Sequence, residues 1–205
     1  VIRGQERSYR PTINDSEIEL KILRPQEIPV SVAYGLHDLG ITGKDWIEET
    51  QADVEILQDL EYGNVKLVLA VPKSWDHINS LSDLLKEFLS EGKTVRISTE
   101  YLNLTKKYIK ANEVYREAFG DADPTVVTPW WREGNNPKVT VYLSFGATEA
   151  KPPEDADAII DLTETGTTLE RNNLKVIEVI LESSAVLIAN KDSLRDPRKH
   201  DKIYD

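Results

Sequence analysis

The segment from Asp161 to Leu169, which reads DLTETGTTL, combines carboxylates, threonine hydroxyls and a single glycine. It follows an apolar run over residues 156–162 that is typical of a buried strand. A strand that ends in such a turn, ahead of a helix-compatible stretch, presents backbone N–H groups and hydroxyls to an anion. The acids Asp161 and Glu164 suit a sugar phosphate, whose diol they can bind and whose metal ion they can share. The pattern fits equally well a strand, turn and helix with a threonine N-cap, as any α/β protein contains.

Composition excludes several classes of protein. Of 205 residues, 40% are hydrophobic and 30% charged, which is typical of a globular chain with room for one large or two modest domains. The formal net charge of −11 argues against nucleic acid as a partner, because phosphate backbones require a basic surface. No apolar run approaches the roughly 18 residues of a membrane helix, so we expect no membrane partner.

Two absences in the composition lead to further expectations. The chain has no cysteine, which excludes disulfides and thiolate metal sites and favours a cytoplasmic location. It also begins at Val1 and has no methionine, so we expect it to be part of a longer polypeptide.

Short apolar runs alternate with helix-like segments along the chain, which predicts an α/β fold with mostly parallel sheets and helices on both faces. The predicted strands are 17–23, 38–42, 65–71, 94–98, 139–144, 156–162, 174–180 and 185–189. The predicted helices are 24–34, 44–50, 80–89, 101–110 and one from about residue 194. Residues 112–138 form a long irregular connection, and such connections are usually functional or mobile. Its Trp130-Trp131 pair is either an exposed interaction patch or, as is commoner, an anchor for the loop.

Several motifs occur in one order along the chain: DLGITGKD (38–45), LVLAVP (67–72), RISTEY (96–101), GATE (146–149), DLTETGTTL (161–169) and LESSAVLIAN (181–190). The ordered set resembles ATP phosphoribosyltransferase, a family of histidine biosynthesis, from about Arg7 to Lys191. The GATE form resembles the longer members, whose regulatory domain would follow Asp205. Between Glu149 and Asp161 the chain is one residue shorter than the family's usual pattern.

The resemblance implies a two-lobed fold similar to periplasmic binding proteins, with the active site in the inter-lobe cleft. Residues 1–92 with 175–205 would form lobe I, the nucleotide side without its first strand. Residues 93–174 would form lobe II, which holds the phosphoribosyl pyrophosphate loop. The reaction implied is transfer of the phosphoribosyl group to N1 of ATP, with release of pyrophosphate and assistance from Mg²⁺. The family further implies a homo-oligomer, and feedback inhibition by histidine only where the C-terminal domain is present.

The resemblance also implies roles for individual residues. Glu149 and Asp161 would be catalytic, accepting hydrogen bonds from the ribose hydroxyls and favouring a cationic transition state. The residues expected to bind phosphoribosyl pyrophosphate are Asp161, Glu164, Thr165, Gly166, Thr167, Thr168 and Leu169. Those expected to bind ATP are Arg24, Asp38, Leu39 and Gly40, although Arg24 also fits a surface arginine before a helix. No residue is assigned as a metal ligand.

Two other functional classes share this predicted fold. A two-lobed solute-binding protein would bind a ligand without chemistry, but a simple amino-acid receptor has no need of the acidic, threonine-rich 161–169 loop. A non-catalytic paralogue would keep the fold and lose that loop, which is intact here. Release of pyrophosphate from the two substrates separates all three possibilities.

Overall fold

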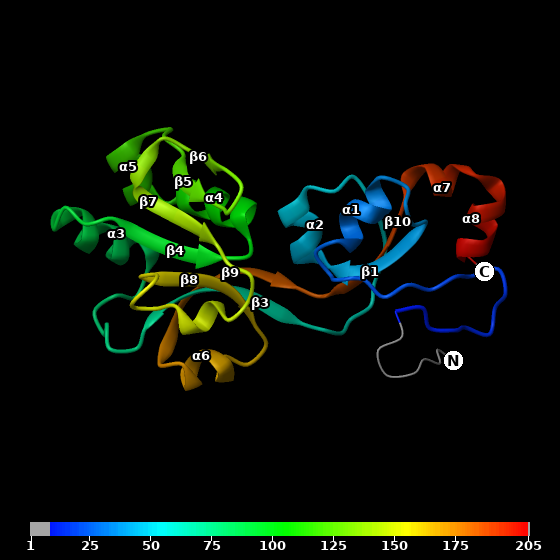
Figure 1. Ribbon diagram of the computed structural model, residues 1–205, viewed down its shortest axis with the longest axis horizontal. Helices are drawn as coiled ribbons and strands as arrows, with labels where there is room; N and C mark the ends of the chain where they lie inside the picture. Colours follow the sequence, from blue (N-terminus) through cyan, green and yellow to red (C-terminus); the bar gives the residue numbers. More distant parts are fainter. Residues whose placement is uncertain (1–8, 205) are drawn as a thin grey trace. The chain divides into compact units, whose positions relative to one another are not determined.

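The computed structural model describes residues 9–204, which fall into two compact units (Figure 1). The described residues up to Leu60 join those from Ala185 onward in unit 1, and Glu61–Ser184 form unit 2. This division differs from the predicted boundaries, which assigned residues up to 92 and from 175 to the first lobe. The reason is strand pairing: β3 (Val65–Pro72) lies between β8 (Ala158–Thr163) and β9 (Leu174–Ser183), so all three belong to one sheet.

Unit 2 is built on a seven-stranded sheet in the order β6-β5-β7-β4-β8-β3-β9. The remaining strands are β4 (Val95–Thr99), β5 (Pro124–Val127), β6 (Arg132–Glu133) and β7 (Asn136–Leu143). β4 is parallel to β7 and β8, and β5 is parallel to β7, whereas β3 runs antiparallel to both of its neighbours. The carboxyl ends of β5, β7, β4 and β8 therefore share one edge of the sheet, which we call the carboxyl edge.

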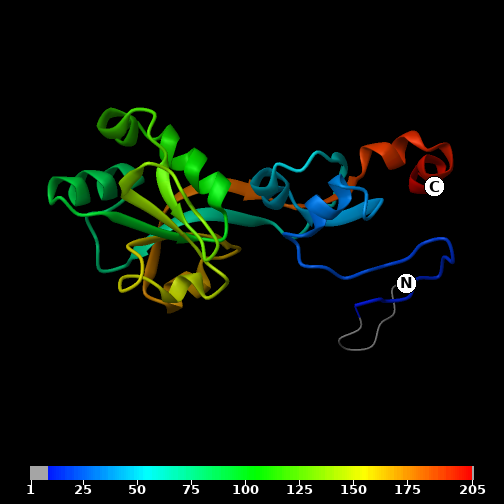
Figure 2. The same ribbon diagram turned by 45° about the horizontal axis from the view of Figure 1, so that its top comes forward.

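Helices lie on both sides of this sheet, with α4 (Leu102–Ala111) and α5 (Glu113–Phe119) on one side and α6 (Thr167–Arg171) on the other (Figure 2). Another helix, α3 (Leu81–Ser90), begins where the hydroxyl of Ser80 accepts a hydrogen bond from the backbone N–H of Asp83, at 3.0 Å. Leu169 of α6 packs with Val68, Ala70, Ile159 and Leu174 of the sheet. The structure thus confirms an α/β fold with helices on both faces of its main sheet.

Unit 1 contains a three-stranded antiparallel sheet in the order β1-β10-β2, whereas parallel sheets were expected. Its elements are α1 (Ile28–Ala33), β1 (Leu39–Gly43), α2 (Lys44–Thr50), β2 (Glu55–Asp59), β10 (Ala185–Ala189), α7 (Lys191–Arg195) and α8 (Pro197–Tyr204). Val32 of α1 packs with Val186 and Ile188 of β10 to form its core. Ile47 of α2 adds to the same cluster.

Some predicted elements differ from the structure. The strand predicted over residues 17–23 is absent, because that alternating segment pairs with no neighbouring strand and is mostly exposed. The helix predicted from residue 24 begins only at Ile28, next to Pro29 in its first turn, where proline is favoured. The connection over 112–138, predicted to be irregular, contains α5, β5 and β6. Helix α5 starts at Asn112, whose side chain accepts a hydrogen bond from the backbone N–H of Tyr115.

Candidate functional site

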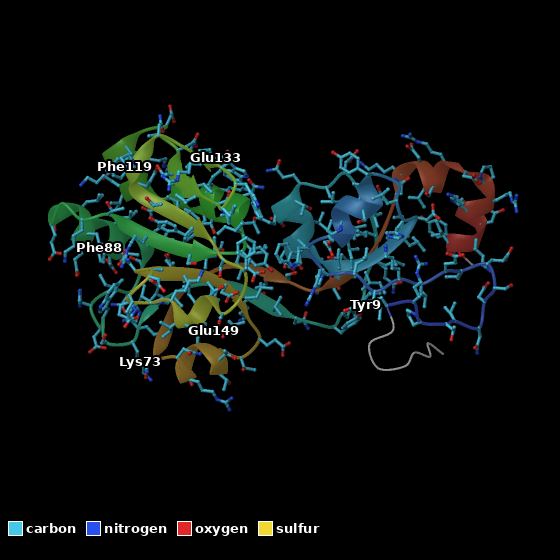
Figure 3. All side chains as sticks on the ribbon, viewed as in Figure 1. Tyr9, Lys73, Phe88, Phe119, Glu133 and Glu149 are labelled. Atoms are coloured by element: carbon cyan, nitrogen blue, oxygen red, sulfur yellow. The ribbon has the colours of Figure 1, made fainter. Side chains whose placement is uncertain are left out.

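A cavity of about 290 Å³ opens at the end of β8 in unit 2. Its lining residues are Glu149, Asp161, Leu162, Thr163, Glu164, Thr165, Thr167, Thr168 and Leu169. Glu149 reaches it from η1 (Thr148–Ala150), on the segment between β7 and β8 (Figure 3). The two acids predicted to be catalytic and nearly all of the predicted phosphoribosyl pyrophosphate ligands therefore lie around one cavity, and Gly166 sits within the loop that forms its wall.

The 161–169 loop is shaped by Gly166, which adopts a φ of 80° that side-chain-bearing residues rarely adopt. The backbone N–H of Gly166 donates to the hydroxyl of Thr163 at 2.7 Å, so this group is already used within the loop. Gly166 is also the N-cap of α6, and no side chain caps that helix. The interpretation of the motif as a threonine N-cap is therefore wrong.

The donors left for an anion follow from this geometry. The backbone N–H groups of residues 167–169 lie in the first turn of α6, where no carbonyl four residues earlier can accept them. The hydroxyls of Thr165 and Thr167 lie 2.9 Å apart and are both exposed to solvent. Amides and hydroxyls of this kind bind phosphate oxygens through hydrogen bonds that the charge of the anion strengthens.

Asp161 lines the cavity and is partly buried, and burial raises its pKa to about 6. The backbone N–H of Leu162 donates to its carboxylate at 2.8 Å and lowers the pKa, while the nearby charges of Glu149 and Glu100 raise it. Near pH 7 the group is therefore ionised in a poorly hydrated position. The ionised form of such a carboxylate is stabilised by hydrogen bonds from ligand hydroxyls or by positive charge nearby.

Sequence reasoning assigned no role to Glu100, although the residue lies inside the quoted RISTEY motif. It follows Thr99 at the carboxyl end of β4, the strand that pairs with β8. Parallel neighbours bring their carboxyl ends to the same edge, so the signal that could have found Glu100 was its position directly after a predicted strand.

The segment 144–149 holds Glu149 in place through a tight turn. The hydroxyl of Thr148 donates to that of Ser144 at 2.9 Å, and the Ser144 hydroxyl donates to the carbonyl of Gly146 at 3.3 Å. Ala147 has a φ of 48°, an uncommon conformation for a residue with a side chain. Strained conformations of this kind are concentrated at functional sites.

The residues predicted to bind ATP lie in unit 1. The carboxylate of Asp38 accepts hydrogen bonds from Ser193 (2.6 Å) and Lys199 (2.7 Å), and Lys199 is the main reason that its pKa is lowered. A Cβ at Gly40 would come within 2.5 Å of the Ile28 side chain, so close packing against α1 explains this glycine. These contacts give Asp38 and Gly40 structural roles within their own unit.

The other two predicted ATP ligands are less constrained. Arg24 is exposed; its backbone N–H donates to the carboxylate of Glu27 at 3.3 Å, and its carbonyl accepts from the backbone N–H of Glu27 at 2.9 Å. The hydroxyl of Thr42 donates to the carbonyl of Pro25 at 2.9 Å, which ties the segment that carries Arg24 to β1. Leu39 begins β1 with 36% of its surface exposed.

Within residues 9–204, no group of three or more His, Cys, Asp or Glu side chains is placed to hold a metal ion. The cavity does offer oxygen atoms from Glu149, Asp161 and Glu164, which are the ligand type that Mg²⁺ prefers. In the same described range, no helix has the length and apolar character needed to cross a membrane.

Comparison with known proteins gives consistent results. A family model described as ATP phosphoribosyltransferase matches residues 24–205. The ATP phosphoribosyltransferase of Chlorobium luteolum is 43% identical over 204 residues, covering 97% of this chain and 58% of that protein. The one from Thermodesulfovibrio yellowstonii is 41% identical over 209 residues, covering 100% of this chain and 61% of that protein. This chain thus spans about three fifths of the length of these relatives.

A solved structure supports the fold. The structure described as the ATP phosphoribosyl transferase (HisG:HisZ) complex from Thermotoga maritima superposes with a TM-score of 0.69 at 23% identity. The superposition covers 100% of this chain and 83% of that one. Together with the sequence matches, it confirms the resemblance inferred from the ordered motifs.

Proposed function

This chain belongs to the ATP phosphoribosyltransferase family, and on that basis we propose that it transfers the phosphoribosyl group of phosphoribosyl pyrophosphate to N1 of ATP. Pyrophosphate is released, and the reaction is the first step of histidine biosynthesis. The observation that carries the proposal is the cavity at the end of β8, where the partly buried Asp161 stands beside a wall of amides and hydroxyls.

The 161–169 loop would bind the 5′-phosphate of the sugar. A phosphate group accepts several hydrogen bonds at once. The backbone N–H groups of residues 167–169 and the hydroxyls of Thr165 and Thr167 would donate them. Binding the phosphate there fixes the sugar, and a fixed sugar presents C1 to the incoming base in one orientation. The amides and hydroxyls of the loop thus position the reactant.

Asp161 would act on the reacting carbon. As the bond from C1 to the pyrophosphate oxygen breaks and the bond to adenine N1 forms, positive charge develops on the ribose and the anomeric carbon inverts. A carboxylate that is partly dehydrated and already in place stabilises that charge more strongly than water does. Glu149, on the segment between β7 and β8, adds a second carboxylate to the same cavity.

Mg²⁺ fits this site as a companion of the substrate. It is usually bound by one or two carboxylates, several waters and substrate phosphates, and carboxylates line this cavity. Glu149 and Glu164 are the acids we propose to contact it. When bound, it would neutralise the pyrophosphate leaving group.

The remaining expectations complete the proposal. We propose that Arg24 and the turn Asp38–Gly40 contribute to ATP binding from unit 1, that the whole protein is a cytoplasmic homo-oligomer, and that histidine inhibits it only through a C-terminal domain. In this structure Lys199 forms an ion pair with the carboxylate of Asp38. The phosphates of bound ATP would compete with that carboxylate for Lys199.

The decisive experiment measures release of pyrophosphate by the full-length protein given phosphoribosyl pyrophosphate and ATP together, and given each alone. We expect release only with both, and loss of most of it in Asp161→Asn. Asp155→Asn, which changes an exposed acid of the same unit outside the cavity lining, is the matched control and should keep full activity. Tight binding of either substrate without any release would instead favour a solute-binding protein or a non-catalytic paralogue.

A further inference from the structure

Exposed aromatic side chains gather near the carboxyl edge of unit 2, outside the cavity. Trp130 is 72% exposed and Phe145 69%, with Trp131 at 44% and Tyr142 at 37%. The rings of Trp130 and Phe145 meet edge to face with their centroids 5.8 Å apart. We call these two residues the aromatic pair. The expectation that tryptophans anchor this loop on its own domain therefore does not hold for Trp130, whose recorded ring contact is with another exposed ring.

The turn that carries Trp130 is held in one shape. The hydroxyl of Thr128, a residue only 8% exposed, accepts hydrogen bonds from the backbone N–H groups of Trp130 (3.2 Å) and Trp131 (3.0 Å). The backbone N–H of Thr128 donates to the carbonyl of Trp131 at 3.0 Å. Ordering the turn in this way costs conformational entropy, yet the indole that it presents stays in solvent. A rigid turn with an exposed ring is suited to receiving a ligand.

The aromatic pair is connected to the cavity through one segment. Phe145 directly follows the buried Ser144, and Glu149, which lines the cavity, closes the same hydrogen-bonded turn. Thr99 of β4 pairs with Leu143 of β7 on one side and with Ile160 of β8 on the other, so these two residues lie about 10 Å apart across the sheet. Phe145 follows Leu143 by two residues, and Asp161 directly follows Ile160. The pair therefore stands beside the cavity on the same edge.

The cavity itself offers no flat apolar surface to a heterocycle. Its side chains are carboxylates and hydroxyls, apart from Leu162 and Leu169. The proposed reaction nevertheless requires a purine to stand next to the sugar. Stacking of a base on an aromatic ring needs no particular charge on the protein, and it contributes about 1–3 kcal/mol per base.

We propose that the aromatic pair of Trp130 and Phe145 stacks the adenine ring of the nucleotide substrate and thereby holds N1 toward the sugar in the cavity. This inference rests on the proposed function for the identity of the base. The 144–149 segment would then contact both substrates. Phe145 near its start would contact the base, and Glu149 at its end would face the sugar.

The test compares Trp130→Leu and Phe145→Leu in the full-length protein with Trp75→Phe as the matched control. Trp75 packs on Phe88 of α3, away from the aromatic pair. Binding of ATP, of ribose 5-triphosphate and of phosphoribosyl pyrophosphate is measured by calorimetry. We expect ATP to bind about tenfold or more weakly to each leucine variant, as loss of one stacked base implies. Ribose 5-triphosphate, which lacks the base, should bind all variants alike.

Indole fluorescence provides a second measurement. Addition of ATP should change the fluorescence of the wild type and of Trp75→Phe, but not that of Trp130→Leu. Unchanged ATP affinity in both leucine variants overturns the inference, as does an equal loss for ribose 5-triphosphate. A change in oligomeric mass without a change in ATP affinity also overturns it, and would make the patch an interface between copies.

The outcomes keep the two proposals apart. If the wild type releases no pyrophosphate from its two substrates and the leucine variants still lose ATP affinity, the function fails and the stacking site stands. If the wild type and Trp130→Leu release pyrophosphate with the same KM for ATP, the function stands and the stacking site fails.

Discussion

The hydroxyl of Thr163 accepts a hydrogen bond of 2.7 Å from the backbone N–H of Gly166, and this contact closes the loop that walls the cavity. Thr163 is the last residue of β8, so the bond ties the loop to the end of a strand whose Ala158–Ile160 residues are buried. A loop fixed in this way keeps its donors in place before the ligand arrives, which lowers the entropic cost of binding.

Thr163→Val tests this contact, because valine keeps the shape of the side chain and removes the acceptor. One hydrogen bond is worth about 0.5–1.5 kcal/mol, so the Kd for phosphoribosyl pyrophosphate should rise roughly three- to tenfold. Calorimetric titration measures it. Thr163→Ser keeps the hydroxyl and should bind normally, whereas equal binding by all three proteins would show that the bond does not shape the site.

Gly166→Ala should lose stability and substrate binding together. A Cβ at this position meets no atom within 4 Å, so the penalty comes from the positive φ, which costs about 1–2 kcal/mol for a residue with a side chain. Gly92 is a matched control, because it has a φ of 70° and equally open surroundings but lies after α3, outside the cavity lining. Thermal unfolding should show a similar loss in both variants, and only Gly166→Ala should bind phosphoribosyl pyrophosphate more weakly.

The pH dependence of catalysis should report Asp161. Its folded-state pKa is raised to about 6, and the proposed role requires the ionised form. The value of kcat/KM should therefore rise with pH and level off above about 6. Asp161→Asn should lower kcat by about 10²-fold or more, and the remaining activity should lack that acidic limb. A variant with raised KM and normal kcat would show that Asp161 only binds the diol.

The same carboxylate should lower the stability of the folded protein above about pH 6. Its pKa is raised from the ordinary aspartate value of 3.8 to about 6, so between these pH values the folded protein holds a proton that the unfolded chain has lost. Stability thus falls as pH rises from about 4 to 6, by about 2–3 kcal/mol for a shift of that size. Asp161→Asn should gain stability relative to the wild type at pH 7.5 and not at pH 4. Urea unfolding at the two pH values checks this, and equal differences at both would contradict it.

Local sequence patterns predicted the helices and strands that carry the site. They predicted less well which strands pair with one another and in which direction. Helix α2 has the predicted bounds of residues 44–50, and β8 with its following turn was found from its apolar run. By contrast, β2 (Glu55–Asp59) has only one residue that is not exposed, so no alternation marked it in the sequence. The reversed direction of β3 was hidden too, because a continuous apolar run looks the same in either direction.

The candidate site could be predicted only where its residues are neighbours in sequence. The 161–169 loop was recognised because its carboxylates, hydroxyls and glycine lie together. Glu100 reaches Asp161 only through the pairing of β4 with β8, and the raised pKa of Asp161 comes chiefly from burial. The apolar run over residues 156–162 indicated a buried strand, but no local pattern shows which strand pairs with it or which carboxylates lie near Asp161.

The turn over residues 144–149 also determines where this chain tolerates insertions and deletions. Ser144 and Thr148 are joined by a hydrogen bond, and Ala147 takes a backbone conformation that few residues accept, so an added or lost residue would displace Phe145 and Glu149 at once. The segment between Glu149 and Asp161 is tied to β4 as well, because the guanidinium of Arg96 donates to the carbonyls of Pro153 (3.1 Å) and Glu154 (2.8 Å). A change in the length of either segment would therefore be expected to move Glu149 relative to Asp161, so we expect length changes to be tolerated only outside residues 144–161 of this part of the chain.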